Sequence, residues 1–288
     1  MQYDRLFKFF YMYNYICHSY SNIWCSMIEH FTKFDGGGKK DILPLSFSQL
    51  TEFAFNRERW ALRRLFGYEF DTNPAMQRGT VVESGLNMWL NGTDQDEAVE
   101  KMLTEYDQGC SKLVGDKVAN ERENLTPLFN EGVERLKEYA FKWDLVGYQK
   151  KVEMDIHGIP LVGYTDFQFE DKNTKEDFYI DLKTTLRKPN GISNTHAMQQ
   201  AIYQKGTNAN QKLWYLVSKK SGTEFYEFSL SDYKRPMQIC NHIVQAMGLW
   251  LSKVDNLDDV KNILIPNPDE WIWNEEAVYK ARMEVWGY

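Results

Sequence analysis

Three ionisable residues lie in two stretches that otherwise have the pattern of apolar β-strands, and they constrain the fold more than any other feature of the sequence. Asp166 belongs to the first stretch, and Asp181 and Lys183 belong to the second. Because side chains two apart on a strand face the same way, Asp181 and Lys183 project from one face while Leu182 packs on the other. A hairpin through the polar loop 171–176 brings Asp166 beside them. We therefore expect two carboxylates and an ammonium to converge on one surface of a sheet.

This convergence indicates a metal site. Two carboxylates that meet in apolar surroundings repel each other unless a cation lies between them. A hard divalent ion such as Mg²⁺ takes oxygen ligands and retains waters, one of which Lys183 can orient or help to deprotonate. Hydrolysis of a phosphodiester suits these groups best, since a metal ion neutralises the phosphate and the developing negative charge. The alternative is a structural cross-strand ion pair, because Asp-x-Lys is a common tripeptide.

The order of the predicted elements places these strands in a mixed sheet with helices around it. Helical periodicity and capping residues predict helices at about 46–67, 75–90, 94–108, 120–142, 193–206 and 231–254. Alternation and turn signals predict strands at 150–156, 160–170, 177–184, 213–218 and 224–229. The tail, with Trp271, Trp273 and Trp286, is expected to be less regular and to pack across the domain. This order predicts an α/β or α+β mixed-sheet domain with a helical front portion.

Two of the predicted helices carry polar groups that could serve the same site. Glu83 places a carboxylate inside an otherwise apolar helical stretch. The alternative is a solvated glutamate at the edge of a helix. Gln199 and Tyr203 lie four residues apart on one face of the helix that follows the strands, where two hydrogen-bonding groups could hold a phosphate or a scissile strand. Many helices carry such a pair by chance.

Together these residues resemble the PD-(D/E)xK nuclease superfamily, specifically its RecB/Cas4-like exonuclease branch. The resemblance rests on five motifs that occur in the expected order between residues 45 and 229: LSFSQL, GTVVE, GYTD, DLKTT and QQAIY. Each motif is weak alone, but the order and spacing of all five make the signal specific. The resemblance implies a restriction-endonuclease-like core, in which helices flank a central mixed β-sheet. It also implies cleavage of DNA from an end.

The resemblance implies a role for each residue of the predicted site. Asp166 and Asp181 match the family's metal ligands, and the Leu182 carbonyl completes the set, so the implied cofactor is Mg²⁺ or Mn²⁺. Lys183 matches the lysine that activates water or stabilises the transition state. Glu83 stands where the family has a His or Glu that assists metal binding.

The chain is acidic, so contact with DNA must be local. It has 34 Lys and Arg against 41 Asp and Glu, for a formal net charge of −7. Phosphate contacts supply most nucleic-acid affinity, and basic clusters on the first helix and directly after the Asp-Leu-Lys strand could provide them. The alternative for each cluster is a solubilising patch. The residues expected to contact DNA, from these clusters and from the QQAIY helix motif, are Arg57, Arg63, Arg187, Lys188, Gln199 and Tyr203.

Cysteine usage separates this sequence from many of the proteins it resembles. It has four cysteines and no Cys-x-x-Cys pair, and Phe55-Asn56 stands near the place of the family's Cys-Pro. No iron–sulfur cluster is therefore expected. The same scarcity favours a reducing setting, which is the cytoplasm, or the host-cell cytoplasm if the chain is virus-encoded.

The amino-terminal region differs from the rest. Residues 9–28 contain no Asp, Glu, Lys or Arg but are rich in Tyr, Asn and Ser, which argues against a membrane span. The alternatives are a poorly ordered or partner-docked aromatic extension, a membrane or export segment, and an over-extended reading frame that truly starts at Met27. A Gly-rich joint at 36–38 closes this region. We therefore expect an extension at 1–42 and a single nuclease domain at 43–288.

The functional expectation is a metal-dependent exonuclease in recombination, repair or genome processing, with DNA as its partner and a helicase or recombinase as a further candidate partner. Two alternatives remain. One is a structure- or site-specific endonuclease, although nothing in the sequence encodes readout of base edges. The other is a catalytically silent DNA-binding subunit of a larger complex, against which the full set of acids and lysine argues.

Overall fold

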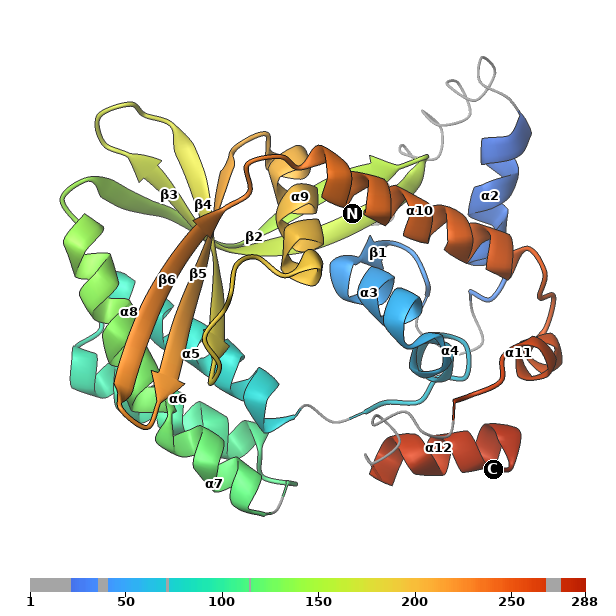
Figure 1. Ribbon diagram of the computed structural model, residues 1–288, viewed down its shortest axis with the longest axis horizontal. Coiled ribbons are helices and arrows are strands. Elements are labelled where there is room, and N and C mark those ends of the chain that lie inside the picture. The colour runs from blue at the N-terminus through green and yellow to red at the C-terminus, as the bar shows by residue number, and fades with distance from the viewer. Residues whose placement is uncertain (1–21, 36–40, 71–72, 114, 268–275) are drawn as a thin grey trace, which may run out of the picture. The chain divides into compact units, whose positions relative to one another are not determined.

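The computed structural model describes residues 22–35, 41–70, 73–113, 115–267 and 276–288 (Figure 1). The chain divides into two compact units, which are described separately. One comprises residues 71–152 and 163–237, and the other comprises residues 1–70, 153–162 and 238–288. These boundaries cut through the predicted 43–288 domain, so that assignment stays a prediction. The first unit contains every residue of the predicted metal site.

The first unit holds most of a mixed β-sheet. Its strands are β2 (Trp143–Ile156) and β3 (Ile159–Asp171), which both extend into the other unit, and β4 (Asp177–Thr185), β5 (Asn210–Lys219) and β6 (Gly222–Ser229). β2 pairs with β3, and β3–β4 and β5–β6 are antiparallel. β4 and β5 are parallel because helix α9 (Asn194–Thr207) connects them as a crossover. The predicted mixed sheet is confirmed.

Helices cover one face of this sheet, and α9 contacts the other. The helices of the first face are α5 (Pro74–Leu90), α6 (Gln95–Gly109), α7 (Asp116–Glu123) and α8 (Leu125–Tyr139). Their apolar side chains form one buried cluster with Ile180 and Leu182 of β4 and with Trp214 of β5. Tyr215, the neighbour of Trp214, contacts His196 of α9 on the opposite face. Asp181 and Lys183 alternate with Ile180 and Leu182, so they belong to the α9 face.

The second unit is mainly helical. It contains α2 (Asn22–Thr32), β1 (Leu45–Ser46), α3 (Phe47–Phe55), α4 (Arg57–Arg64), most of α10 (Lys234–Leu251), α11 (Leu257–Ile263) and α12 (Glu276–Trp286). β1 pairs in parallel with β3 at Leu161 and Val162. Phe53, Trp60 and Trp250 meet edge to face, with ring centroids 5.2 to 6.1 Å apart. This aromatic cluster ties α3 and α4 to α10.

Two predicted helices are divided in the structure. The helix predicted at 46–67 breaks at Asn56. The backbone of Asn56 is not helical, with φ of −152°, and its side chain accepts the Arg59 N–H as the cap of the next helix. The helix predicted at 120–142 breaks at Asn124. Pro127 follows in the first turn of α8, where it lacks the N–H that would continue α7. The Asn56 cap in one case and Pro127 in the other therefore outweigh the apolar periodicity that runs through both breaks.

The ends of the chain differ from expectation in one respect. The tail was expected to be less regular, but its last part forms the helix α12, and the short helix α11 just before the tail was not predicted. Trp286 packs against Phe66 with ring centroids 5.8 Å apart, while Trp271 and Trp273 lie outside the described residues. Residues 1–21 of the amino-terminal extension also lie outside them. Among the described residues, no helix has the length and apolar character needed to cross a membrane.

Candidate active site

The predicted site begins where the pairing between β3 and β4 stops. The register of the two strands runs from Glu170 opposite Asp177 to Phe167 opposite Ile180. Two residues beyond Ile180, the Leu182 N–H donates to Oδ2 of Asp166 at 2.7 Å instead of to a strand carbonyl. A carboxylate therefore takes the place of a strand at this edge of β4.

The two other charged residues of the motif contact each other. Asp181 is only 1% exposed, and its Oδ2 lies 2.6 Å from Nζ of Lys183, whose side chain is 24% exposed. Burial raises the pKa of Asp166 well above its ordinary range, and the charge of Asp181 adds to this effect. Burial alone would lower the pKa of Lys183, but Asp181 and Asp166 raise it above its ordinary value. The acids thus strongly favour a positive charge beside them.

The oxygen atoms at this edge fit a hard divalent cation. Within the described part of the chain, no hydrogen-bond partner reaches the buried Oδ1 of Asp181. The N–H and C=O of a strand residue point to the same edge, so the Leu182 carbonyl faces the gap in which its N–H meets Asp166. Two carboxylates and a carbonyl are ligands that Mg²⁺ and Mn²⁺ accept, with waters in the remaining positions.

Glu83 lies near this gap but is held by other residues. Its Oε1 accepts a hydrogen bond from Nε2 of Gln149 at 2.7 Å, and it also hydrogen-bonds the side chain of Tyr148. Burial raises the pKa of Glu83, and these two hydrogen bonds oppose the increase. The charge of Lys183 also lowers this pKa, whereas the charge of Asp181 raises it. Across the described ranges, no group of three or more His, Cys, Asp or Glu side chains is placed to hold a metal ion. A ligand role for Glu83 therefore stays a prediction.

Sequence reasoning did not find the residues that hold Glu83. Tyr148 and Gln149 lie just before the strand predicted from residue 150, and β2 in fact begins at Trp143. Gln149 has φ of 49°, in the left-handed region that a non-glycine residue rarely adopts. Such a residue inside a strand interrupts its regular alternation and redirects a side chain. No short motif signals this conformation.

The predicted pair on α9 lies against the GYTD motif. Nε2 of Gln199 donates to the Tyr203 hydroxyl at 3.1 Å. A methyl group on Gly163 would lie 2.6 Å from Cε1 of Tyr203, so the tyrosine ring packs directly on the glycine backbone. Burial, followed by the charge of Asp181, raises the pKa of Tyr203 to about 12. The glycine of GYTD thus gives α9 its close approach to β3.

A second pair on the α9 face was not predicted. Nδ1 of His196 and the Tyr215 hydroxyl share a hydrogen bond. Tyr215 lies opposite Lys183 in the parallel pairing of β4 with β5. Only the strand register reveals this proximity, since neither residue belongs to a recognisable motif.

The predicted basic contacts divide between the two units. Arg187 and Lys188 are exposed directly after β4, and Nζ of Lys188 lies 5.3 Å from the centroid of the Tyr226 ring. On α4 in the other unit, the Arg57 guanidinium lies 4.6 Å from the centroid of a phenylalanine ring. Arg63 lies 3.5 Å from a carboxylate oxygen of Glu52, which offsets part of its charge. The first pair therefore offers the more available positive charge.

One comparison with known proteins identifies the family of this chain. A family model described as the PD-(D/E)XK nuclease superfamily matches residues 44–260, a range that contains every predicted site residue. The chain belongs to this superfamily. Among solved structures, "Crystal structure of SSO0001" matches at 17% identity over 59% of this chain and 86% of that chain, with a TM-score of 0.31. The comparison with curated proteins gave no match.

The superfamily assignment supports the predicted fold and indicates a nuclease. Its members typically use divalent metals, and the oxygen donors at the β4 edge fit that chemistry. The narrower RecB/Cas4-like branch stays a prediction.

The site geometry predicts a specific effect on cation binding. Asp181→Asn removes one of two carboxylates while preserving the shape of the side chain, so we expect Mn²⁺ to bind at least about tenfold more weakly, measured by calorimetry. Glu176→Gln serves as the control, since Glu176 lies exposed in the loop before β4. Equal Mn²⁺ affinity in Asp181→Asn and the wild type would contradict the assignment of Asp181 as a ligand.

Proposed function

We propose that this chain is a divalent-metal-dependent deoxyribonuclease that hydrolyses phosphodiester bonds from DNA ends. The observation that carries the proposal is the open edge of β4. There Asp166 binds the Leu182 N–H, and the almost fully buried Asp181 lies 2.6 Å from Lys183. In a surface ion pair, neither the burial of Asp181 nor the occupation of a strand hydrogen-bond position by Asp166 would be needed.

The side chains of this edge have separate tasks in the proposed reaction. A bound Mg²⁺ or Mn²⁺ would supply Lewis-acid stabilisation of the phosphate and a nucleophile at neutral pH. Asp166, Asp181 and the Leu182 carbonyl would hold that ion. Lys183, with three N–H donors beside the acids, can orient the attacking water or donate to a phosphate oxygen as negative charge develops. Glu83, held by Gln149, would assist at the margin of the site.

The same face offers groups that can position the DNA strand. Gln199 hydrogen-bonds Tyr203, whose ring packs against Gly163 of the GYTD strand, so the pair can direct a backbone phosphate toward the acids. Arg187 and Lys188 follow the strand that carries Lys183 and can contact neighbouring phosphates. We propose Arg57 and Arg63 as additional phosphate contacts of the second unit. None of these groups forms a pattern that would read base edges, which favours action at ends over recognition of a sequence.

The proposed reaction predicts both its dependence on Lys183 and its need for an end. With Mn²⁺, end-labelled linear DNA should be degraded while covalently closed circles remain intact. Lys183→Ala should lower kcat about 10² to 10³-fold, because the loss of one preorganised donor commonly has an effect of that size. Lys220→Ala, at the exposed tip between β5 and β6, is the control that should leave the rate unchanged.

Two results would decide against parts of this proposal. Equal rates on circles and linear DNA would contradict cleavage from ends and favour an endonuclease. Metal-dependent degradation that persists unchanged in Lys183→Ala would contradict the assigned active site.

The basic pair after β4 predicts the salt dependence of binding. In the double variant Arg187→Gln/Lys188→Gln, DNA affinity should fall for all sequences. The slope of log K against log salt concentration should decrease by about 1.4 to 1.8, since each phosphate contact contributes about 0.7 to 0.9. Binding is measured by fluorescence anisotropy in Ca²⁺ or without metal. The control Lys172→Gln/Lys175→Gln alters two lysines before the start of β4, and a similar loss there would argue for unspecific charge effects.

A further inference from the structure

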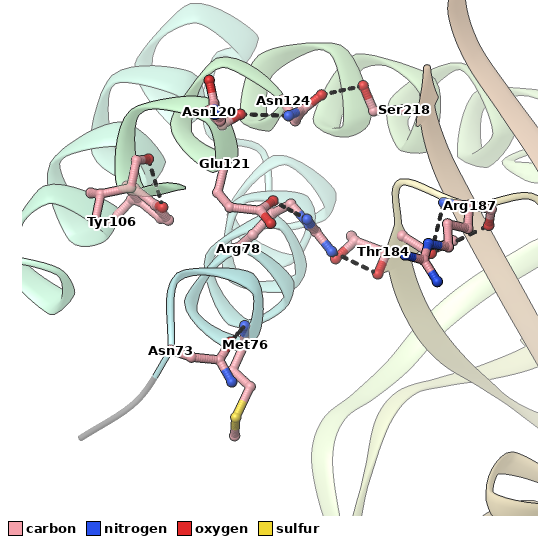
Figure 2. A network of polar contacts seen from close by, with 12 residues as sticks. Asn73, Met76, Arg78, Tyr106, Asn120, Glu121, Asn124, Thr184, Arg187 and Ser218 are labelled. Atoms are coloured by element: carbon pink, nitrogen blue, oxygen red, sulfur yellow. Dashed lines mark hydrogen bonds and ion pairs between the residues drawn. The ribbon is translucent and has the colours of Figure 1, made fainter. Parts of the chain in front are cut away.

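Arg78 of α5 is almost fully buried, at 5% exposure, and its guanidinium binds three groups on two other elements (Figure 2). Its Nε donates to Oγ1 of Thr184 at 3.1 Å, and its Nη2 donates to the Thr184 carbonyl, also at 3.1 Å. Its Nη1 pairs with the carboxylate of Glu121 on α7, which is 7% exposed. Arg78 thus holds both a side-chain and a backbone oxygen of one β4 residue.

The residue that Arg78 holds lies next to the proposed catalytic lysine. Thr184 directly follows Lys183 on β4, beyond the point where pairing with β3 ends. Thr184 and Leu182 are two apart, so their backbone polar groups face the same edge of the strand. Asp166 binds the Leu182 N–H, and Arg78 binds the Thr184 carbonyl. Asp166 and Arg78 therefore bind the backbone groups just before and just after Lys183 that a neighbouring strand would otherwise bind.

Arg78 also connects this edge to the helix that carries Glu83. Glu83 is five positions after Arg78, which corresponds to about 7.5 Å along the axis of α5. Gly79, the next residue of α5, also lies beside Thr184, since a methyl group on it would be in ordinary van der Waals contact with Oγ1 of Thr184, at 3.6 Å. The contact between Arg78 and Thr184 therefore sets the position of Glu83 relative to the end of β4.

Glu121 orients the guanidinium and extends the contact to a second strand. The α7 helix that carries Glu121 ends at Glu123, and the next residue, Asn124, accepts a hydrogen bond from Ser218 of β5 at its Oδ1 (Figure 2). A planar guanidinium with donors in a rigid fork needs acceptors in fixed directions, which a lysine could not satisfy in the same way. The network thus spans α5, α7, β4 and β5.

We propose that Arg78, oriented by Glu121, is a positioning residue that fixes the β4 segment bearing Leu182 and Lys183 against α5. This inference rests on the proposed nuclease function. Arg78 itself touches neither the metal ligands nor DNA in this role. It acts by holding the backbone whose carbonyl and lysine face Asp166.

The test replaces the network without leaving a buried charge. In Arg78→Met/Glu121→Leu both charges are lost together, a change that commonly preserves stability. We expect a Tm close to that of the wild type, an unchanged KM for linear DNA, a kcat at least about tenfold lower and a Mn²⁺ affinity about 10 to 100-fold weaker, as for other residues that orient metal ligands. The control is Arg122→Met/Asp107→Leu, which removes an exposed ion pair between α7 and α6 with an N–O distance of 2.7 Å.

A second pair of variants applies if the double variant does not fold. Thr184→Val removes only the Oγ1 acceptor and should lower kcat and Mn²⁺ affinity, whereas Thr184→Ser keeps this acceptor and should restore both. Wild-type kcat and Mn²⁺ affinity in Arg78→Met/Glu121→Leu, or in Thr184→Val when the double variant is unfolded, would overturn the inference alone. A wild-type chain that neither binds Mn²⁺ nor cleaves DNA would contradict the proposed function and this inference with it.

Discussion

The end of the β3–β4 pairing at Ile180 is the constraint on which the rest of the site depends. A continued ladder would occupy the backbone groups of β4 and leave no room for a cation. Because pairing stops, the Leu182 N–H binds the Asp166 carboxylate and the Leu182 carbonyl faces the same gap. The end of this pairing leaves an opening lined by oxygen atoms. On its other edge, β4 stays paired with β5 as far as Thr185.

The opening brings together carboxylates that repel each other unless a cation lies between them. Asp181 is buried, the pKa of Asp166 is raised by burial and by Asp181, and Lys183 compensates for only part of the negative charge. Ion pairs of this kind rarely add stability, so their presence in a sheet is better explained by function. The net negative charge of the chain is compatible with the proposed function, because binding to DNA requires only a few local cations.

The sequence predicted the parts of this arrangement that depend on local periodicity. Asp181 and Lys183 share a face because they are two apart, and Gln199 contacts Tyr203 because they are four apart. The contacts that hold the site together join distant residues: Gln149 with Glu83 across 66 positions and Arg78 with Thr184 across 106. Neither pair carries a spacing that predicts it, and the left-handed Gln149 appears only in the folded chain. The helix breaks at Asn56 and Asn124 were missed because apolar periodicity continues across them.

The central claim is that a divalent cation binds between Asp166 and Asp181 at the open edge of β4. The most direct measurement is anomalous diffraction from a crystal of the protein soaked in Mn²⁺. The account predicts a peak within direct coordination distance of one oxygen of each aspartate and of the Leu182 carbonyl. A crystal in which Lys183 alone fills this gap, with no anomalous peak at saturating Mn²⁺, would contradict it.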